Sequence, residues 1–160
     1  MRLAALLAAC ALGVGLAAIG HAAEPVTVTV RFIDARNGKP YAYNKDRVQI
    51  FLYKSDPSKG FNSYAEARAN NVGVVRQFPD ANGEVTFALP NPMPGVIEIP
   101  AILTGCGPGR FDTKAVVEKG VVGENLCRTK LRKMNVKFEA KPGEIIYFVA
   151  PLSFWERLFR

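Results

Sequence analysis

The sequence predicts an all-β fold, a β-sandwich of seven or eight short strands. Three observations carry this prediction. Several short segments alternate strictly between apolar and polar residues, which is typical of strands with one buried face. Clusters of Gly, Pro, Asn and Asp separate these segments. Helical spacing of apolar residues is almost absent between residues 23 and 151.

The first half of the domain supplies the clearest strands. The residues at 79–83 (Pro-Asp-Ala-Asn-Gly) form a turn, so the segments on either side of it are expected to pair as a hairpin. Between the second and third strands, the polar segment 55–71 contains Ser63-Tyr-Ala-Glu66, a capping box that predicts one short helix. The predicted strands of this half cover residues 26–32, 48–54, 72–78 and 84–89.

The second half is less regular. Residues 104–112 are expected to form a Gly-rich loop, and residues 114–122 are a weaker, mixed strand candidate. Residues 144–149 are continuously apolar after Glu144, as in a central strand covered on both faces. The predicted strands of this half therefore cover residues 96–99, 114–122, 133–139 and 144–149.

The N-terminal residues predict a secretory signal peptide. Arg2 precedes an uncharged apolar run, and Gly20 and Ala22 occupy the two small positions of a cleavage site after Ala22. Cleavage after Ala23 would put His21 at one of those positions, which is less suitable. The resulting division is a signal peptide (1–22), a sandwich domain (23–151) and a C-terminal tail (152–160). The protein is thus expected in the periplasm, cell envelope or extracellular space.

Two other interpretations of the N-terminus remain open. The apolar run could stay uncleaved as an anchor helix, although about 17 residues is short for a bilayer. Alternatively, Leu7-Ala-Ala-Cys10 fits the processing site of bacterial lipoproteins, with Cys10 carrying the lipid.

Export would favour a disulfide between the remaining cysteines. Beyond residue 22 the chain keeps two cysteines, Cys106 and Cys127, and no histidine. An even number of cysteines in an exported protein predicts a disulfide, here with one possible pairing. Two free thiols are the alternative, and the spacing does not fit a Cys-x-x-Cys redox pair.

Residues 26–89 resemble a known family. The first alternating strand, the turn Asn37-Gly-Lys-Pro40, the strand 48–52 and the segment Asp80-Ala-Asn-Gly-Glu-Val-Thr-Phe87 are similar to the start of carboxypeptidase-regulatory-like, or transthyretin-like (prealbumin-like), domains. The resemblance implies an Ig-like, prealbumin-like sandwich. It also implies an accessory, adhesive or binding role on an exported protein rather than catalysis.

Two specialised relatives of this fold do not match. Transthyretin-like hydroxyisourate hydrolases use histidines and a C-terminal Tyr-Arg-Gly-Ser, whereas this chain ends in Leu-Phe-Arg. Surface pilins join a first-strand Lys to a last-strand Asn, but residues 26–32 contain no Lys and residues 145–149 no Asn.

Catalytic chemistry has few candidate residues. Without a histidine, a Ser-His-Asp or Cys-His arrangement and a His-ligated zinc are excluded from the domain. Asp80-Ala-Asn-Gly83 is too short for a calcium loop, and the Gly-rich loop lacks the Lys-Ser/Thr of a phosphate loop. The carboxylates mostly adjoin turns. We therefore expect a non-enzymatic protein without a cofactor.

Two surface segments could make contacts of other kinds. The chain has a formal net charge of +7, and its Lys and Arg residues are densest between residues 128 and 141. This basic stretch would be explained by a solvated strand face, or by contact with anionic lipid or polysaccharide. Nucleic acid is not an expected partner. In a helical tail, the residues Phe154, Trp155, Leu158 and Phe159 would share one face, which would cap the sandwich or dock on a membrane or partner.

Two functional hypotheses follow from the sequence. In the first, the protein is a binding module for a protein or glycan partner of the cell envelope, and its contact surface is the 55–71 segment with Tyr64 and Arg68, together with the Gly-rich loop near Cys106. In the second, it is a structural or membrane-peripheral envelope protein that uses the aromatic tail and the basic stretch.

Overall fold

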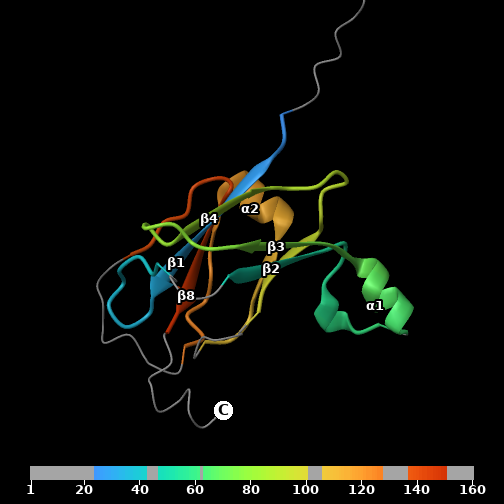
Figure 1. Cartoon of the computed structure of the whole chain (residues 1–160), viewed down its shortest axis with the longest axis horizontal. Helices are drawn as coiled ribbons and strands as arrows, with labels where there is room; N and C mark the ends of the chain where they lie inside the picture. Colours follow the sequence, from blue (N-terminus) through green and yellow to red (C-terminus); the bar gives the residue numbers. More distant parts are fainter. Residues whose placement is uncertain (1–23, 43–46, 62, 101–105, 128–136, 151–160) are drawn as a thin grey trace, which may run out of the picture.

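Two four-stranded sheets form the body of the protein. The computed structural model describes residues 24–42, 47–61, 63–100, 106–127 and 137–150. Sheet A has the strand order β4-β1-β8-β7 and sheet B the order β3-β2-β5-β6 (Figure 1). The strands are β1 (Thr27–Asp34), β2 (Val48–Tyr53), β3 (Asn71–Gln77), β4 (Glu84–Ala88), β5 (Val96–Ile99), β6 (Gly109–Asp112), β7 (Val121–Val122) and β8 (Glu144–Val149). This arrangement confirms the predicted β-sandwich.

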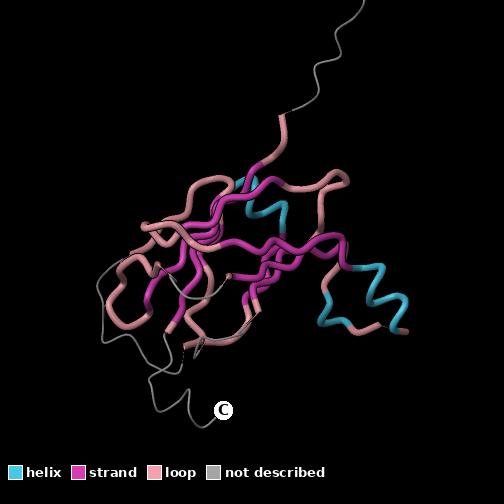
Figure 2. The backbone as a smooth tube through the Cα atoms, in the orientation of Figure 1, coloured by secondary structure: helices cyan, strands magenta, loops and turns pink. Residues whose placement is uncertain are grey.

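Three short helices join the strands. The 3-10 helix η1 (Pro57–Lys59) and helix α1 (Tyr64–Asn70) lie between β2 and β3, and helix α2 (Thr113–Lys119) follows β6. Figure 2 shows the strands in the middle of the molecule and the helices at its periphery. The predicted helix is confirmed, because Ser63 Oγ accepts a hydrogen bond from Glu66 N at 3.1 Å and so caps α1.

The main core lies between the two sheets. Alternate residues of β1 and β2 face inward, as the sequence pattern predicts. Tyr147 of β8 makes edge-to-face ring contacts with Phe32 of β1 and with Phe111 of β6. The two sheets are therefore linked by aromatic packing as well as by aliphatic side chains, which include Val28, Val30, Ile50, Leu52, Val85 and Ile97.

A second, smaller core covers the other face of sheet A. Every residue of β8 is buried. Ile146 and Phe148 point away from the main core and pack with Ile33 against Phe138 and Cys127. The prediction of a central strand covered on both faces is confirmed, and β8 runs parallel to both of its neighbours, β1 and β7.

The predicted hairpin of the third and fourth strands is wrong. The turn itself forms, because Asp80 Oδ1 accepts hydrogen bonds from Asn82 N and Glu84 N. However, β3 pairs with β2 in sheet B, whereas β4 pairs with β1 in sheet A. The chain crosses from one sheet to the other at this turn, so that β4 can bury its apolar face in the same core from the opposite side.

Three assignments in the second half also change. Residues 114–122 form α2 and then the short strand β7, because the Asp112 carboxylate caps the helix by accepting from Ala115 N at 2.8 Å. The end of the predicted Gly-rich loop is strand β6, which pairs with β5. Residues 137–139 of the predicted strand 133–139 are not in a strand, and the rest of it lies outside the described residues.

Several predicted features lie outside the described residues altogether. These are the signal peptide with Cys10, the densest part of the basic stretch and the C-terminal tail with Phe154, Trp155, Leu158 and Phe159. Within the described part of the chain, no helix has the length and apolar character that crossing a membrane requires.

Candidate binding surface

The segment between β2 and β3 folds into a compact projection with fixed ends. Figure 1 shows η1 and α1 extending from the end of these strands, away from both sheets. Asn70, which is buried, accepts hydrogen bonds from Ser55 N and Ser55 Oγ and donates one to Ser55 O, each at 2.9 Å. Lys54 N also donates to Asn70 O at 2.9 Å. These four bonds join the first and last residues of the projection and hold it against the sheet.

A shallow pocket lies where the projection meets sheet B. Its volume is about 510 Å³, which is in the range of small-ligand sites. Most of its wall is apolar, and Tyr53, Arg68 and Asn71 are the lining residues with polar side-chain groups. The lining residues are Tyr53, Pro57, Phe61, Ala67, Arg68, Asn71 and Val74. We call this the Tyr53 pocket.

Tyr53 forms the sheet side of the pocket. Its ring stacks on Phe51, with 6.2 Å between ring centroids and 17° between ring planes, and Phe51 supports it from outside the pocket. Burial raises the pKa of Tyr53, the Glu98 carboxylate raises it further, and Arg110 partly offsets the increase. Arg110 and Glu98 form an ion pair, with 2.7 Å between Nε and Oε2. The phenol is therefore neutral at physiological pH and available as a hydrogen-bond donor.

Arg68 supplies the positive charge of the pocket. It is exposed on α1, and no carboxylate of the described residues lies within ion-pair distance of it. An exposed cation beside an apolar wall can pair with an anionic group of a ligand whose apolar part enters the pocket.

Of the two predicted contact residues, the structure describes the side chain of Arg68 only. Arg68 lines the Tyr53 pocket, whereas Tyr64 begins α1 and its side chain is not described. The described residues of the Gly-rich loop are absent from the pocket lining, so the two predicted contact segments do not combine. Sequence reasoning missed Tyr53 and Phe61. The signal for Tyr53 was available, since it alternates with the buried Ile50 and Leu52 and must face outward.

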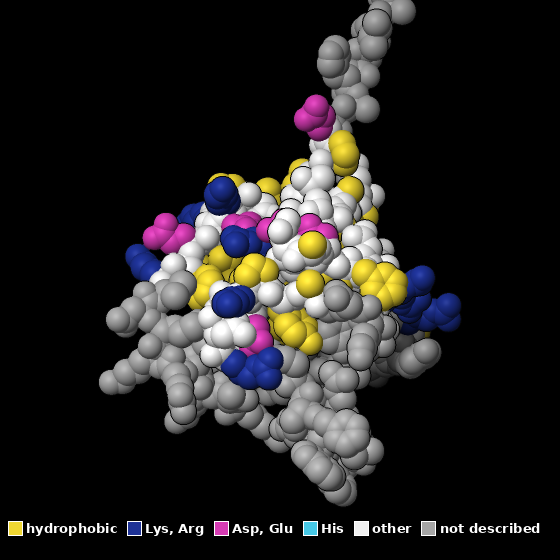
Figure 3. All heavy atoms as spheres, turned by 60° about the vertical axis from the view of Figure 1, so that its left-hand side comes forward, with side chains coloured by type: hydrophobic (Ala, Val, Ile, Leu, Met, Phe, Trp, Pro, Cys, Tyr) yellow, Lys and Arg dark blue, Asp and Glu magenta, His cyan; other side chains and the backbone are white. Residues whose placement is uncertain are grey.

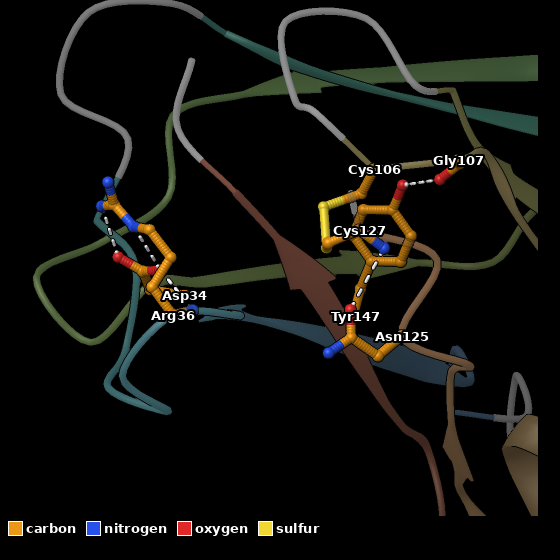
Figure 4. The surroundings of a disulfide bond; sticks show 7 residues. All are labelled: Asp34, Arg36, Cys106, Gly107, Asn125, Cys127 and Tyr147. Atoms are coloured by element: carbon orange, nitrogen blue, oxygen red, sulfur yellow. Dashed lines mark hydrogen bonds and ion pairs between the residues drawn. A yellow bond between two sulfur atoms is a disulfide. The ribbon is translucent and has the colours of Figure 1, made fainter. Parts of the chain in front are cut away.

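The disulfide lies in another part of the molecule. Cys106 and Cys127 are joined, as predicted, and Cys106 is buried (Figure 4). Next to them, the Tyr147 hydroxyl donates to Gly107 O at 2.7 Å and Cys127 N donates to Asn125 Oδ1 at 3.1 Å. The bond thus ties the segment before β6 to the segment after β7, which places a cover over sheet A.

A buried carboxylate organises the turn after β1. The Arg36 guanidinium donates to both oxygens of Asp34, at 3.1 and 2.8 Å, and Arg36 N donates to Oδ1 at 2.8 Å (Figure 4). Burial alone would raise the pKa of Asp34, but the hydrogen bonds from Arg36 and Asn37 outweigh it and the pKa is lowered. All these partners belong to one turn, so the cluster has a structural role.

The remaining charges do not assemble into a further site. Figure 3 views the side of the molecule that carries the turn after β1, and Lys and Arg side chains there lie among acidic and hydrophobic ones rather than in one block. No group of three or more His, Cys, Asp or Glu within the described ranges could hold a metal ion.

Comparisons with known proteins add little. No protein-family model matches the chain. No curated protein matches it either. Among solved structures, the chain is similar to the full-length major pilin SpaD from Corynebacterium diphtheriae, with a TM-score of 0.39 and 14% identity, and the match covers 79% of this chain and 29% of that one.

Proposed function

We propose that this protein is an exported, non-enzymatic binding module that contacts a protein or glycan partner of the cell envelope through the Tyr53 pocket. The observation that carries the proposal is an aromatic wall beside Arg68, which has no acidic partner among the described residues. Both are held on a projection whose ends Ser55 and Asn70 fasten together. Rigid scaffolds that present a fixed loop for recognition are common among β-sandwiches.

The disulfide supports export. Bonds of this kind persist in oxidising compartments and are rare in the cytoplasm. The signal peptide predicted over residues 1–22 agrees with that compartment. Cell envelope and extracellular space are both consistent with this reasoning.

The polar groups of the pocket suit recognition better than catalysis. Its described lining offers a guanidinium, an amide and a phenol, without a carboxylate pair or a nucleophile next to a base. Model ester, glycoside and peptide substrates are therefore expected to show no turnover, and turnover that disappears in an Arg68→Ala variant would contradict a non-enzymatic role.

A crosslinking experiment tests the binding surface. A photoreactive amino acid replaces Ala67 in the pocket or, as a matched control, Ala81 in the turn between β3 and β4, and the full chain is expressed in its own envelope or an export-competent host. We expect a discrete adduct from position 67 and none from position 81. Equal labelling from both positions, or none from 67, would contradict the proposal.

The C-terminal tail supports a second candidate function. In a helix, the spacing of Phe154, Trp155, Leu158 and Phe159 would place these residues on one apolar face, which would suit a membrane-peripheral or structural role. Sedimentation with anionic lipid vesicles compares the full chain with a chain that lacks residues 152–160. Unchanged partitioning would refute the membrane role and leave the pocket as the remaining candidate.

A further inference from the structure

Strand β3 is the longest edge strand that the structure describes. Among the four edge strands, β3 spans seven residues, whereas β4 spans five, β6 four and β7 two. On its outer side no described strand pairs with β3. In an antiparallel sheet, alternate N–H and C=O groups of an edge strand point away from its neighbour and are free to pair with another chain.

The open edge is continuous with the Tyr53 pocket. Val74 and Asn71 belong to β3 and also line the pocket. An extended chain that pairs with β3 therefore passes the mouth of the pocket, and one of its side chains can enter it. Strand addition combines these two elements in many peptide-binding domains, because backbone bonds provide affinity and a pocket provides selectivity.

The positive charge along this edge indicates the chemistry of the partner it would bind. β3 contains Arg76 and no acidic residue, Arg68 precedes it, and Arg47 lies over the Phe78 ring at its far end, 5.5 Å from the ring centroid. Neither Arg68 nor Arg76 has an acidic partner within the part of the chain that the structure describes. Two copies of this chain that paired edge to edge would bring these cations together, so the edge suits an acidic partner and not itself.

We propose that β3 binds an extended acidic segment of another protein by strand addition, with an apolar side chain of that segment in the Tyr53 pocket and a carboxylate on Arg68. This inference rests on the proposed binding function and chooses a protein partner over a glycan. An anionic glycan could pair with the arginines, but it cannot extend the sheet along β3.

Peptide selection followed by hydrogen exchange tests the inference. A displayed library of random twelve-residue peptides is selected against the full chain purified from an export-competent host. We expect enriched peptides that alternate apolar residues and contain Asp or Glu, with binding that weakens as salt increases. The enriched peptide should slow amide exchange in β3, and a scrambled peptide of the same composition should not.

Two variants separate the edge from the pocket. Arg68→Gln is expected to weaken binding about two- to fivefold, the range of an exposed charge pair. Arg76→Glu, which puts a negative charge on β3 outside the pocket lining, is expected to weaken binding of an acidic segment about tenfold. Lys39→Gln removes a comparable exposed charge from the turn after β1 and should leave the affinity unchanged.

The outcomes distinguish this inference from the proposed function. Failure to enrich any peptide, or a bound peptide without slower exchange in β3, would overturn strand addition. Tighter binding of oligogalacturonate than of the selected peptide, with crosslinking from position 67 intact, would overturn the protein partner while the binding module stands. Absence of crosslinking from position 67 would instead reject the binding module itself.

Discussion

The Cys106–Cys127 disulfide should be a major source of stability. Replacing both cysteines by alanine frees a loop whose ends are 21 residues apart in the sequence. In the chain-entropy expression, a loop of this length lowers the entropy of the unfolded chain by about 11 cal/mol/K, which corresponds to about 3 kcal/mol at 25 °C. We therefore expect the double variant to lose about 3 kcal/mol of unfolding free energy, a large part of what a domain of this size has.

Urea denaturation measures this loss. The variant should unfold at a lower midpoint and with a larger dependence on urea, because its unfolded chain is less constrained and exposes more surface. Wild-type protein under reducing conditions is the matched control and should behave like the variant. A loss below about 1 kcal/mol would refute the entropic reasoning. It would mean that the unfolded chain is already restricted in this segment, so that the disulfide removes little of its entropy.

Three further changes test local features of the fold. Thr113→Val removes a buried hydroxyl that has no hydrogen-bond partner among the described residues. The variant should have an unfolding free energy about 1 kcal/mol higher in urea titrations. A lower unfolding free energy would show that the hydroxyl has a hydrogen-bond partner. Gly120→Ala should lower the unfolding free energy by about 2 kcal/mol or more, because φ is +73° and the new methyl group would overlap the Lys141 carbonyl. Gly60→Ala, at φ +77° with open space around it, should lower it by about 1 kcal/mol. Equal costs at the two glycines would refute the overlap. Asp34→Asn should lower the unfolding free energy at pH 7, and by progressively less as the pH falls below about 3.8. The pKa of Asp34 is lower in the folded protein than in the unfolded chain. The carboxylate therefore stabilises the fold above the unfolded-state pKa, and this contribution is lost as the folded carboxyl is protonated. Urea midpoints at pH 7 and pH 3 that differ equally between variant and wild type would contradict this assignment.

The strands were predictable where burial imposes a simple pattern. In β1 and β2 one face is buried, so apolar and polar residues alternate, and in β8 both faces are buried, so they do not. These patterns depend on neighbours in the sequence and on one burial rule. Sheet membership depends on distant pairing instead. The alternation in β4 is the same whether it pairs with β3 or with β1, and only the structure distinguishes the two.

Helix α2 shows why a local pattern can mislead. Its segment contains Val116 and Val117, which favour strands, and the sequence predicts a strand there. The Asp112 cap and the burial of Val116 against the main core stabilise a helix instead. Tertiary contact outweighs a propensity of less than about 1 kcal/mol per residue.

The candidate site was predictable only in part. A polar segment between two strands pointed to Arg68, because loops on rigid scaffolds carry contacts. The wall formed by Tyr53 and Val74 was not identified, since it depends on how the projection folds back beside the sheet. No pattern within residues 55–71 reports which strand face lies opposite them.

In the proposed binding mode, stability and recognition depend on different sheets. The outer face of sheet A is covered by Phe138 and Cys127, and the disulfide fixes this cover. The Tyr53 pocket and the open β3 edge belong to sheet B and share no lining residue with that cover. Breaking the disulfide should therefore lower the unfolding free energy without changing peptide affinity, provided binding is measured by calorimetry well below the variant's melting temperature. A large affinity loss in a folded, reduced protein would show that the two sheets are coupled and that the cover on sheet A takes part in recognition.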